Sequence, residues 1–104
     1  TTHTPQLSVA AARVLGLLGT PRAQRTLIEI ANAQSRPISE RQAAAEAFRT
    51  AVSRRGLMLT RQQLLRQYEL YNASQFLDSE TQQVLSSLLD TIEIRAKSAE
   101  SAKQ

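Results

Sequence analysis

The fold is decided by the stretch Leu7-Ser8-Val9-Ala10-Ala11-Ala12-Arg13-Val14-Leu15-Gly16-Leu17-Leu18-Gly19-Thr20-Pro21-Arg22-Ala23. An alanine-rich segment leads into large apolar residues and ends at a Gly-x-Pro break. After a further helical segment the theme returns as Arg41-Gln42-Ala43-Ala44-Ala45-Glu46-Ala47-Phe48. Because alanine favours helices and has little bulk, such segments let a neighbouring helix approach closely. The pattern therefore predicts helical hairpins that stack on one another.

Breaks divide the whole chain into five predicted helices. Thr4-Pro5 and Thr20-Pro21 each place a capping side chain before a proline at the first helical position. Gly19 is predicted to be a left-handed cap, and Gly56 a Schellman-type end that Leu57 covers. The predicted helices span residues 5–18, 21–33, 40–55, 61–71 and 79–96, and residues 97–104 are predicted to fray.

Capping boxes mark three further helix starts. In such a box a Ser or Thr side chain and a Gln three residues later each bind the backbone N–H of the other. The predicted boxes are Ser39–Gln42, Thr60–Gln63 and, with Asp78 as the other candidate cap, Ser79–Gln82. Asn72, which tolerates the left-handed conformation, is the predicted end of the fourth helix.

Apolar residues at helical spacing predict one buried stripe on each helix. With 41% hydrophobic but only 4% aromatic residues, the core must consist mainly of Leu, Ile, Val and Ala. Gly16 lowers helix propensity and marks a close approach of another backbone. The predicted buried residues are Val9 or Ala10, Val14, Leu17 and Leu18; Ala23, Leu27, Ile30 and Ala31; Ala44, Ala47, Phe48, Ala51 and Val52; Leu64, Leu65, Tyr68 and Tyr71; and Val84, Leu85, Leu88, Leu89 and Ile92.

Three of the predicted helices align on an internal repeat. The equivalent pairs Val14-Leu15, Ala47-Phe48 and Val84-Leu85 are separated by 33 and 37 residues. Such a period is typical of α-solenoids, in which each hairpin buries its apolar face on the next one. We expect an all-α chain, with residues 1–104 forming one right-handed α-solenoid domain. A self-contained five-helix bundle with a chance repeat is the alternative.

Over residues 7–55 the chain resembles HEAT-like repeats of the HEAT and armadillo type, in particular the short bacterial kind. The resemblance rests on the runs at 10–23 and 39–48, quoted above. Gly19-Thr20-Pro21 stands for the Gly-Asp-Pro type turn of the family, and Arg41 lies where the family has an arginine. Ser39 replaces the Asp cap, and Glu40 replaces a valine. The resemblance implies a non-catalytic scaffold that binds another protein.

The repeat also predicts an incomplete stack. If the first helix is the second half of a repeat, its partner helix lies outside this sequence. We therefore expect the chain to be a fragment of a larger protein. Either the rest of that protein or a second copy of this chain is expected to cover the exposed end helices, because solenoids usually need at least three repeats.

The net charge of +4 is unevenly distributed. Residues 1–66 hold ten arginines against three glutamates, and residues 67–104 hold three cations against six acids. The candidate partner-binding residues are Arg22, Arg25, Arg54, Arg55 and Arg61, which lie near predicted helix ends. Phosphate backbones are attracted to such a group, although no aromatic side chain is interleaved for base stacking. Nucleic-acid binding is therefore the alternative function. Clustering of these arginines on one face favours it, and their dispersal argues against it.

No catalytic, cofactor or metal site is predicted. The chain has no cysteine and one histidine, His3, so that the usual nucleophiles, bases and transition-metal ligands do not converge. Its three glycines form no phosphate-binding loop. No apolar run approaches the roughly 18 residues of a membrane span. We expect a chain that is not an enzyme, and the lack of cysteine fits oxidising and reducing compartments alike.

Overall fold

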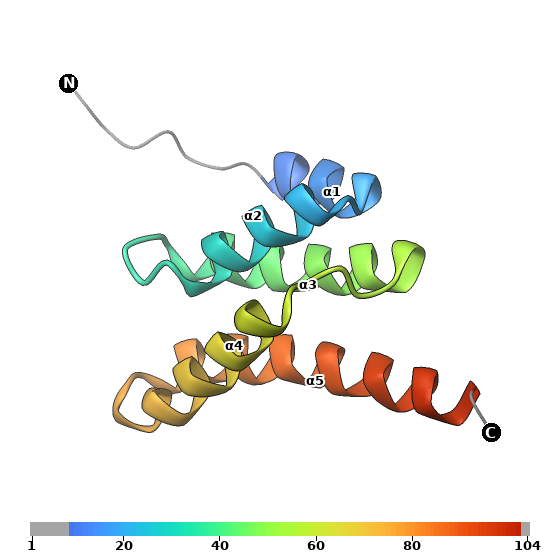
Figure 1. Ribbon diagram of the computed structural model, residues 1–104. Helices are drawn as coiled ribbons and strands as arrows, with labels where there is room; N and C mark the ends of the chain where they lie inside the picture. Colours follow the sequence, from blue (N-terminus) through green and yellow to red (C-terminus); the bar gives the residue numbers. More distant parts are fainter. Residues whose placement is uncertain (1–8, 103–104) are drawn as a thin grey trace.

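The computed structural model describes the backbone of residues 9–102 and the side chains of residues 10–94. Within that part of the chain all regular structure is helical, which confirms the all-α class (Figure 1). The predicted cap at Thr4-Pro5 lies outside the described residues. The elements are α1 (Val9–Leu18), α2 (Pro21–Asn32), α3 (Ile38–Arg55), α4 (Arg61–Ala73), the short 3-10 helix η1 (Ser74–Phe76) and α5 (Ser79–Ala102).

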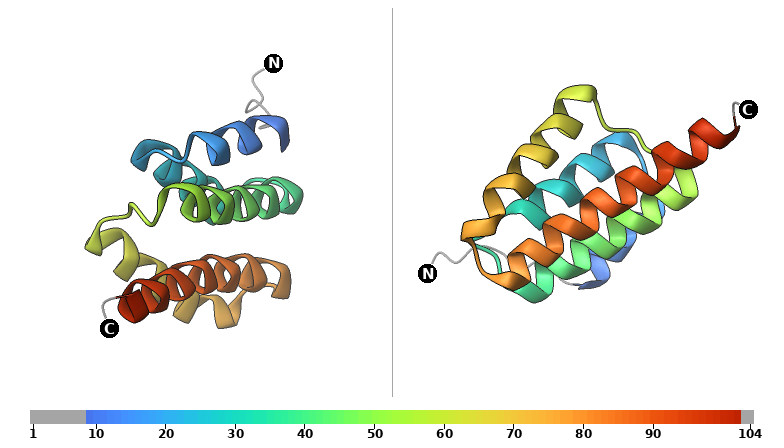
Figure 2. Two further views of the ribbon diagram at one scale, coloured as in Figure 1. Left: turned by 90° about the vertical axis from the view of Figure 1, so that its right-hand side faces the viewer. Right: turned by 90° about the horizontal axis from the view of Figure 1, so that it is seen from below.

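The helices lie in layers around α3. Helix α3 packs against α1 and α2 on one side and against α5 on the other, and α4 packs against α5. In Figure 1, α2 and α4 lie in front of α1, α3 and α5, and Figure 2 shows the same order from two further directions. The turn from α1 to α2 and the linker from α3 to α4 lie at the same edge.

The breaks after α1 and α3 explain where these helices end. Gly19 has φ 60° and Gly56 has φ 85°, a region that favours glycine because it has no Cβ. The predicted left-handed cap at Gly19 is supported. The ψ of 168° at Gly56 lies outside the left-handed helical region, so the predicted Schellman geometry is wrong there.

Two of the predicted helix starts are confirmed by their hydrogen bonds. Thr20 Oγ1 accepts from the Ala23 N–H at 3.1 Å, with Pro21 at the first position of α2. In the Thr60–Gln63 box, the Thr60 N–H donates to Gln63 Oε1 at 2.8 Å. The Gln63 N–H in turn donates to Thr60 Oγ1 at 3.1 Å.

Other predicted ends are wrong. Helix α3 begins at Ile38 after Pro37, so Ser39 lies inside the first turn and cannot cap it. Asn72 does not end α4, which continues to Ala73 and then tightens into η1. Of the two predicted caps of α5, Asp78 is confirmed, because its carboxylate accepts from the Thr81 N–H at 2.9 Å, and Ser79 is wrong. Residues 97–102, predicted to fray, continue α5.

The predicted stripes of α2, α3 and α5 are confirmed as the core. All their members are buried, and Phe48 and Leu88 have no exposed surface. The stripe of α1 is wrong, because Val14, Leu17 and Leu18 are each at least half exposed. On α4, Leu65 and Tyr68 are also exposed, whereas Leu64 and Tyr71 are half-buried.

Small residues decide which face of α1 is buried. Ala12 has no exposed surface, and a Cβ at Gly16 would lie 2.8 Å from the Ala47 carbonyl oxygen of α3. The predicted close approach at Gly16 is therefore confirmed. Because α1 and α3 touch through their smallest residues, Val14 and Leu18 are left exposed. Leu17 borders the space toward α3, whereas Leu15 packs partly against the core.

Buried polar side chains join the layers at two points. Gln24 Nε2 donates to the carbonyls of Gly19 at 3.2 Å and Gly56 at 2.8 Å, and Gln24 Oε1 accepts from the Met58 N–H at 3.0 Å. At the opposite edge, Arg41 Nη1 donates to Thr81 Oγ1 at 2.6 Å. The first set fixes α2 to the α3–α4 linker, and the second fixes α3 to α5.

Candidate functional site

The five arginines selected from the sequence lie near one edge of the molecule. Arg22 and Arg25 are in the first two turns of α2, Arg54 and Arg55 in the last turn of α3, and Arg61 is the first residue of α4. The hydrogen bonds of Gln24 hold these helix ends together. All five side chains are exposed.

The arginines of this edge differ in their surroundings. The stem of Arg55 lies against Gly19, where a Cβ would come within 2.5 Å of Arg55 Cγ. Arg25 instead lines a groove between α2 and α4 together with Arg66. Among the described side chains the one ion pair is Arg36–Glu40 at 3.0 Å, so no acid of the described region forms an ion pair with the arginines of the edge.

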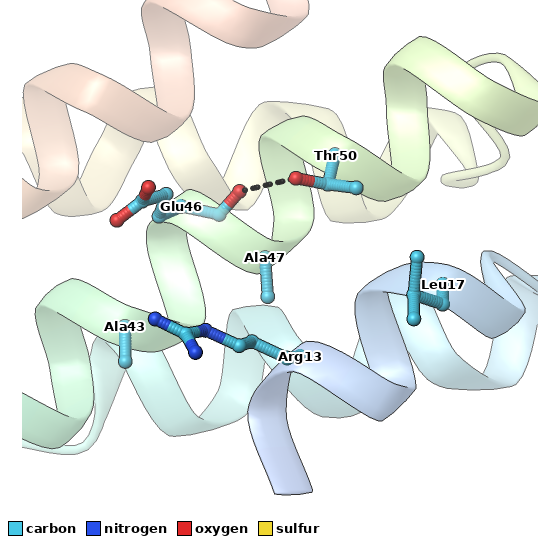
Figure 3. A pocket seen from close by; sticks show the side chains of 6 residues that line it. All are labelled: Arg13, Leu17, Ala43, Glu46, Ala47 and Thr50. Atoms are coloured by element: carbon cyan, nitrogen blue, oxygen red, sulfur yellow. Dashed lines mark hydrogen bonds between the residues drawn. The ribbon is translucent and has the colours of Figure 1, made fainter. Parts of the chain in front are cut away.

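Two further grooves lie beside α3, one toward α1 and one toward α5. The first lies between α1 and α3, has a volume of about 290 Å³ and is lined by Arg13, Leu17, Ala43, Glu46, Ala47 and Thr50. Figure 3 shows the Arg13 side chain extending from α1 across this groove toward α3. Thr50 Oγ1 donates to the Glu46 carbonyl at 3.3 Å. The groove thus combines an apolar wall, a cation and a carboxylate.

The second groove lies between α3 and α5. It has a volume of about 420 Å³ and is lined by Gln42, Ala45, Glu46, Arg49, Gln83, Val84 and Ser87. Glu46 lines both grooves, so the two form neighbouring depressions on either side of α3.

Among the described side chains, two titratable groups have a perturbed pKa, and both shifts come from local contacts. Partial burial and the Glu93 carboxylate raise the pKa of Tyr68, whose Oη donates to Glu93 Oε2 at 3.3 Å. Hydrogen bonds from the Thr81 N–H and hydroxyl lower the pKa of Asp78, with a smaller effect of the Arg41 charge. Neither group lines any of the three grooves described here.

The described residues contain no group of three or more His, Cys, Asp or Glu side chains placed to hold a metal ion. Of the helices in residues 9–102, none has both the length and the apolarity to cross a membrane.

Comparison with protein-family models, with curated proteins and with solved structures found no match to this chain.

Sequence reasoning missed several residues of these grooves. Arg66, Gln67 and Asn32 face the space between α2 and α4, which are far apart in sequence. Arg13 and Arg49 line the other two grooves. The one available signal was Gln67, a polar residue at the spacing of the buried face that begins with Leu64.

Proposed function

We propose that this chain is a non-catalytic protein-interaction module, built as a short HEAT-like stack of helical hairpins. A repeated break supports the stack. Gly19 with positive φ is followed by the capping Thr20, and Gly56 with positive φ is followed by the capping Thr60. Both breaks thus combine a positive-φ glycine with a threonine cap, which follows directly after Gly19 and four residues after Gly56.

The order of the helix contacts also favours a stack over a closed bundle. Helix α1 packs on α2 and α3, and within the described residues it makes no close backbone contact with α4 or α5. In a closed bundle the first and last helices would share one core. In a stack each layer contacts only its neighbours.

Duplication of one layer tests the stack. A second copy of residues 20–56, inserted after Gly56, recreates the Gly-Thr-Pro junction found at 19–21. A stack accommodates the extra hairpin, so we expect more helix by circular dichroism and a thermal midpoint no lower than that of the natural chain. A closed bundle has no place for the insert, and loss of cooperative unfolding would contradict the stack.

The proposed protein-binding function depends on the exposed face of α1. Val14 is 55% exposed, Leu17 54% and Leu18 50%, although α1 is packed against α3 on its other side. Contiguous exposed apolar side chains of this kind mark interaction surfaces. The proposed role is therefore to hold another protein segment on α1 and in the adjoining grooves.

Site-specific photocrosslinking tests the protein-binding role. A photoreactive phenylalanine analogue is placed at Leu17, with an exposed position on α4, Glu69, as the matched control. We expect a discrete protein adduct from Leu17 in cells that make this protein and none from Glu69. An adduct of twice the chain mass would identify a second copy as the partner. If neither position gives a protein adduct, the proposal is wrong.

Nucleic-acid binding is the second candidate, favoured by the exposed arginines at the α2–α3–α4 edge that lack ion pairs. Fluorescence anisotropy with mixed-sequence DNA and RNA at low and near-physiological salt tests it. Binding that weakens steeply with salt and falls in an R54E/R55E variant supports this function, since arginine–phosphate contacts release counterions. Absence of binding at low salt rules it out.

A further inference from the structure

The groove between α2 and α4 differs from the other two because two of its lining residues, Asn32 and Gln67, have buried side-chain oxygens without a hydrogen bond. It has a volume of about 220 Å³, and its apolar wall includes Ile28 from α2 and Leu59 from the linker. Within the described residues α2 and α4 make no close backbone contact, so the groove runs between two separated helices.

Two amide side chains line this groove without hydrogen bonds. Gln67 is only 2% exposed, and no described residue bonds to its Oε1. Asn32 Oδ1 is likewise buried and unpaired. Neither side-chain amide has a hydrogen bond to any described residue. Because buried polar groups are nearly always paired, this arrangement points to a partner from outside the chain.

The amide chemistry favours a peptide over a phosphate as that partner. A side-chain amide offers a donor and an acceptor, as does each peptide group of an extended backbone. An ionised phosphodiester of a nucleic-acid backbone offers acceptors only. An amide that faced only phosphates would leave its oxygen unpaired, whichever way the amide group is turned.

The charges at the groove favour an acidic segment. Arg25 and Arg66 line the groove, are exposed and have no ion pair among the described side chains. Glu29 is the one carboxylate of the lining, so the arginines are in excess. Guanidinium groups bind carboxylates in a planar, bidentate manner.

We propose that the groove between α2 and α4 binds an extended acidic segment of a protein partner. Carboxylates of the segment pair with Arg25 and Arg66, and its backbone amides pair with Gln67 and Asn32. An apolar side chain of the segment covers Ile28. This assignment rests on the proposed protein-interaction function and names the chemistry of one partner.

Selection from a library of displayed random twelve-residue peptides tests the proposal on the whole chain. Peptides are selected on the natural protein, and the affinity of the selected ones is measured for R25E/R66E, Q67L and the control Q75E. We expect enrichment of Asp and Glu, and an affinity loss of at least roughly tenfold in R25E/R66E. Q67L is expected to weaken binding, and Q75E, at an exposed position outside the three grooves, to leave it unchanged.

The variants need a folding control, which is a thermal melt of each. Arg25 and Arg66 are exposed, so their replacement is expected to leave the midpoint unchanged, and R25Q/R66Q serves as a milder version. Q67L removes an unpaired buried amide, so it is not expected to destabilise the protein. If Q67L binds the peptides more weakly and melts no lower than the natural chain, Gln67 acts in recognition and not in the stability of the fold.

Four results would overturn the assignment. Selected peptides that are not acidic, or that bind R25E/R66E as well as the natural chain, exclude this groove. Peptides that bind but lose affinity in Leu17→Asp place the binding site on α1, and the protein-interaction function then stands while this groove assignment fails. The groove is a nucleic-acid site if no peptide is enriched and a twelve-nucleotide single-stranded DNA binds to the chain. The affinity for this DNA would then fall when Arg25 and Arg66 are replaced, but not when Gln67 is replaced.

Discussion

Gln24 and Gln67 are both buried glutamines, but they have opposite effects on the fold. Gln24 bonds to Gly19, Gly56 and Met58 and thereby joins two turns. Gln67 is buried to nearly the same extent and its Oε1 bonds to nothing in the described part of the chain. A paired buried amide stabilises a structure, whereas an unpaired one retains its desolvation penalty.

Replacing each glutamine by leucine is expected to change stability in opposite directions. Q24L leaves two carbonyls and one N–H without their partner, and should lower the free energy of unfolding by about 2 kcal/mol or more. Q67L removes an unpaired amide and should raise it by about 1–2 kcal/mol. Urea denaturation of both variants measures the difference. Destabilisation by Q67L would mean that its amide is satisfied in solution.

Phe48 is the large aromatic residue at the centre of the core, with no exposed surface. Phe48→Ala leaves a cavity where the layers meet, and should cost about 3–5 kcal/mol of unfolding free energy. The exposed Phe76 serves as the matched control, because Phe76→Ala removes little buried surface. Chemical denaturation distinguishes them, and equal effects would contradict the core assignment.

At the scale of the element, α5 depends on the Asp78 cap. The pKa of Asp78 lies below its ordinary value of 3.8 because the Thr81 N–H and hydroxyl donate to the ionised carboxylate. The folded protein therefore binds this proton less readily than the unfolded chain. The stabilisation is present above the ordinary pKa and is lost as the pH falls through the folded pKa.

The cap is tested by comparing the natural chain with D78N between about pH 5 and about pH 2.5. We expect the thermal midpoint of the natural chain to exceed that of D78N at pH 5. The difference should shrink as Asp78 becomes protonated. S79A, beside the cap, should show no such change in its difference from the natural chain. A constant difference for D78N would mean that the carboxylate charge does not stabilise α5.

The stripes that could be predicted from sequence are those whose large apolar residues face the core, on α2, α3 and α5. The stripe of α3 was predicted correctly because neighbours cover both sides of this helix and periodicity then dominates. On the outer helix α1, the small face of Ala12 and Gly16 is buried and the larger apolar residues are exposed. Periodicity alone does not show which face of a helix has a neighbouring helix. On α1, the size and apolarity of the residues therefore predicted the wrong buried face.

The candidate site was predictable only in part, for a related reason. The arginines near helix ends could be selected from the sequence because caps and breaks locate those ends. That Arg25 and Arg66 line one groove depends on how α2 and α4 are placed, which no local pattern encodes. The spacing from Leu64 indicates that Gln67 is on the buried face, but not that its side-chain oxygen has no partner there.

At the scale of the whole molecule, α3 should be the most stable element. It contacts α1, α2 and α5, whereas α1 lies at one end with three large apolar side chains exposed. Local opening of α1 therefore exposes less additional surface than opening of α3. Native-state hydrogen exchange should show the greatest protection in α3 and less in α1. Equal protection throughout would indicate that the helices unfold only together.

The uneven charge also gives the molecule a permanent electric dipole. Among the described side chains, residues 10–56 hold eight arginines against three glutamates, and residues 57–94 hold two arginines against five acids. These segments form opposite ends of the molecule (Figure 1). An acidic partner approaching from solution thus experiences a torque that turns the α1–α3 end toward it before contact. Added salt weakens this orienting field, because at 0.15 M it decays over about 8 Å.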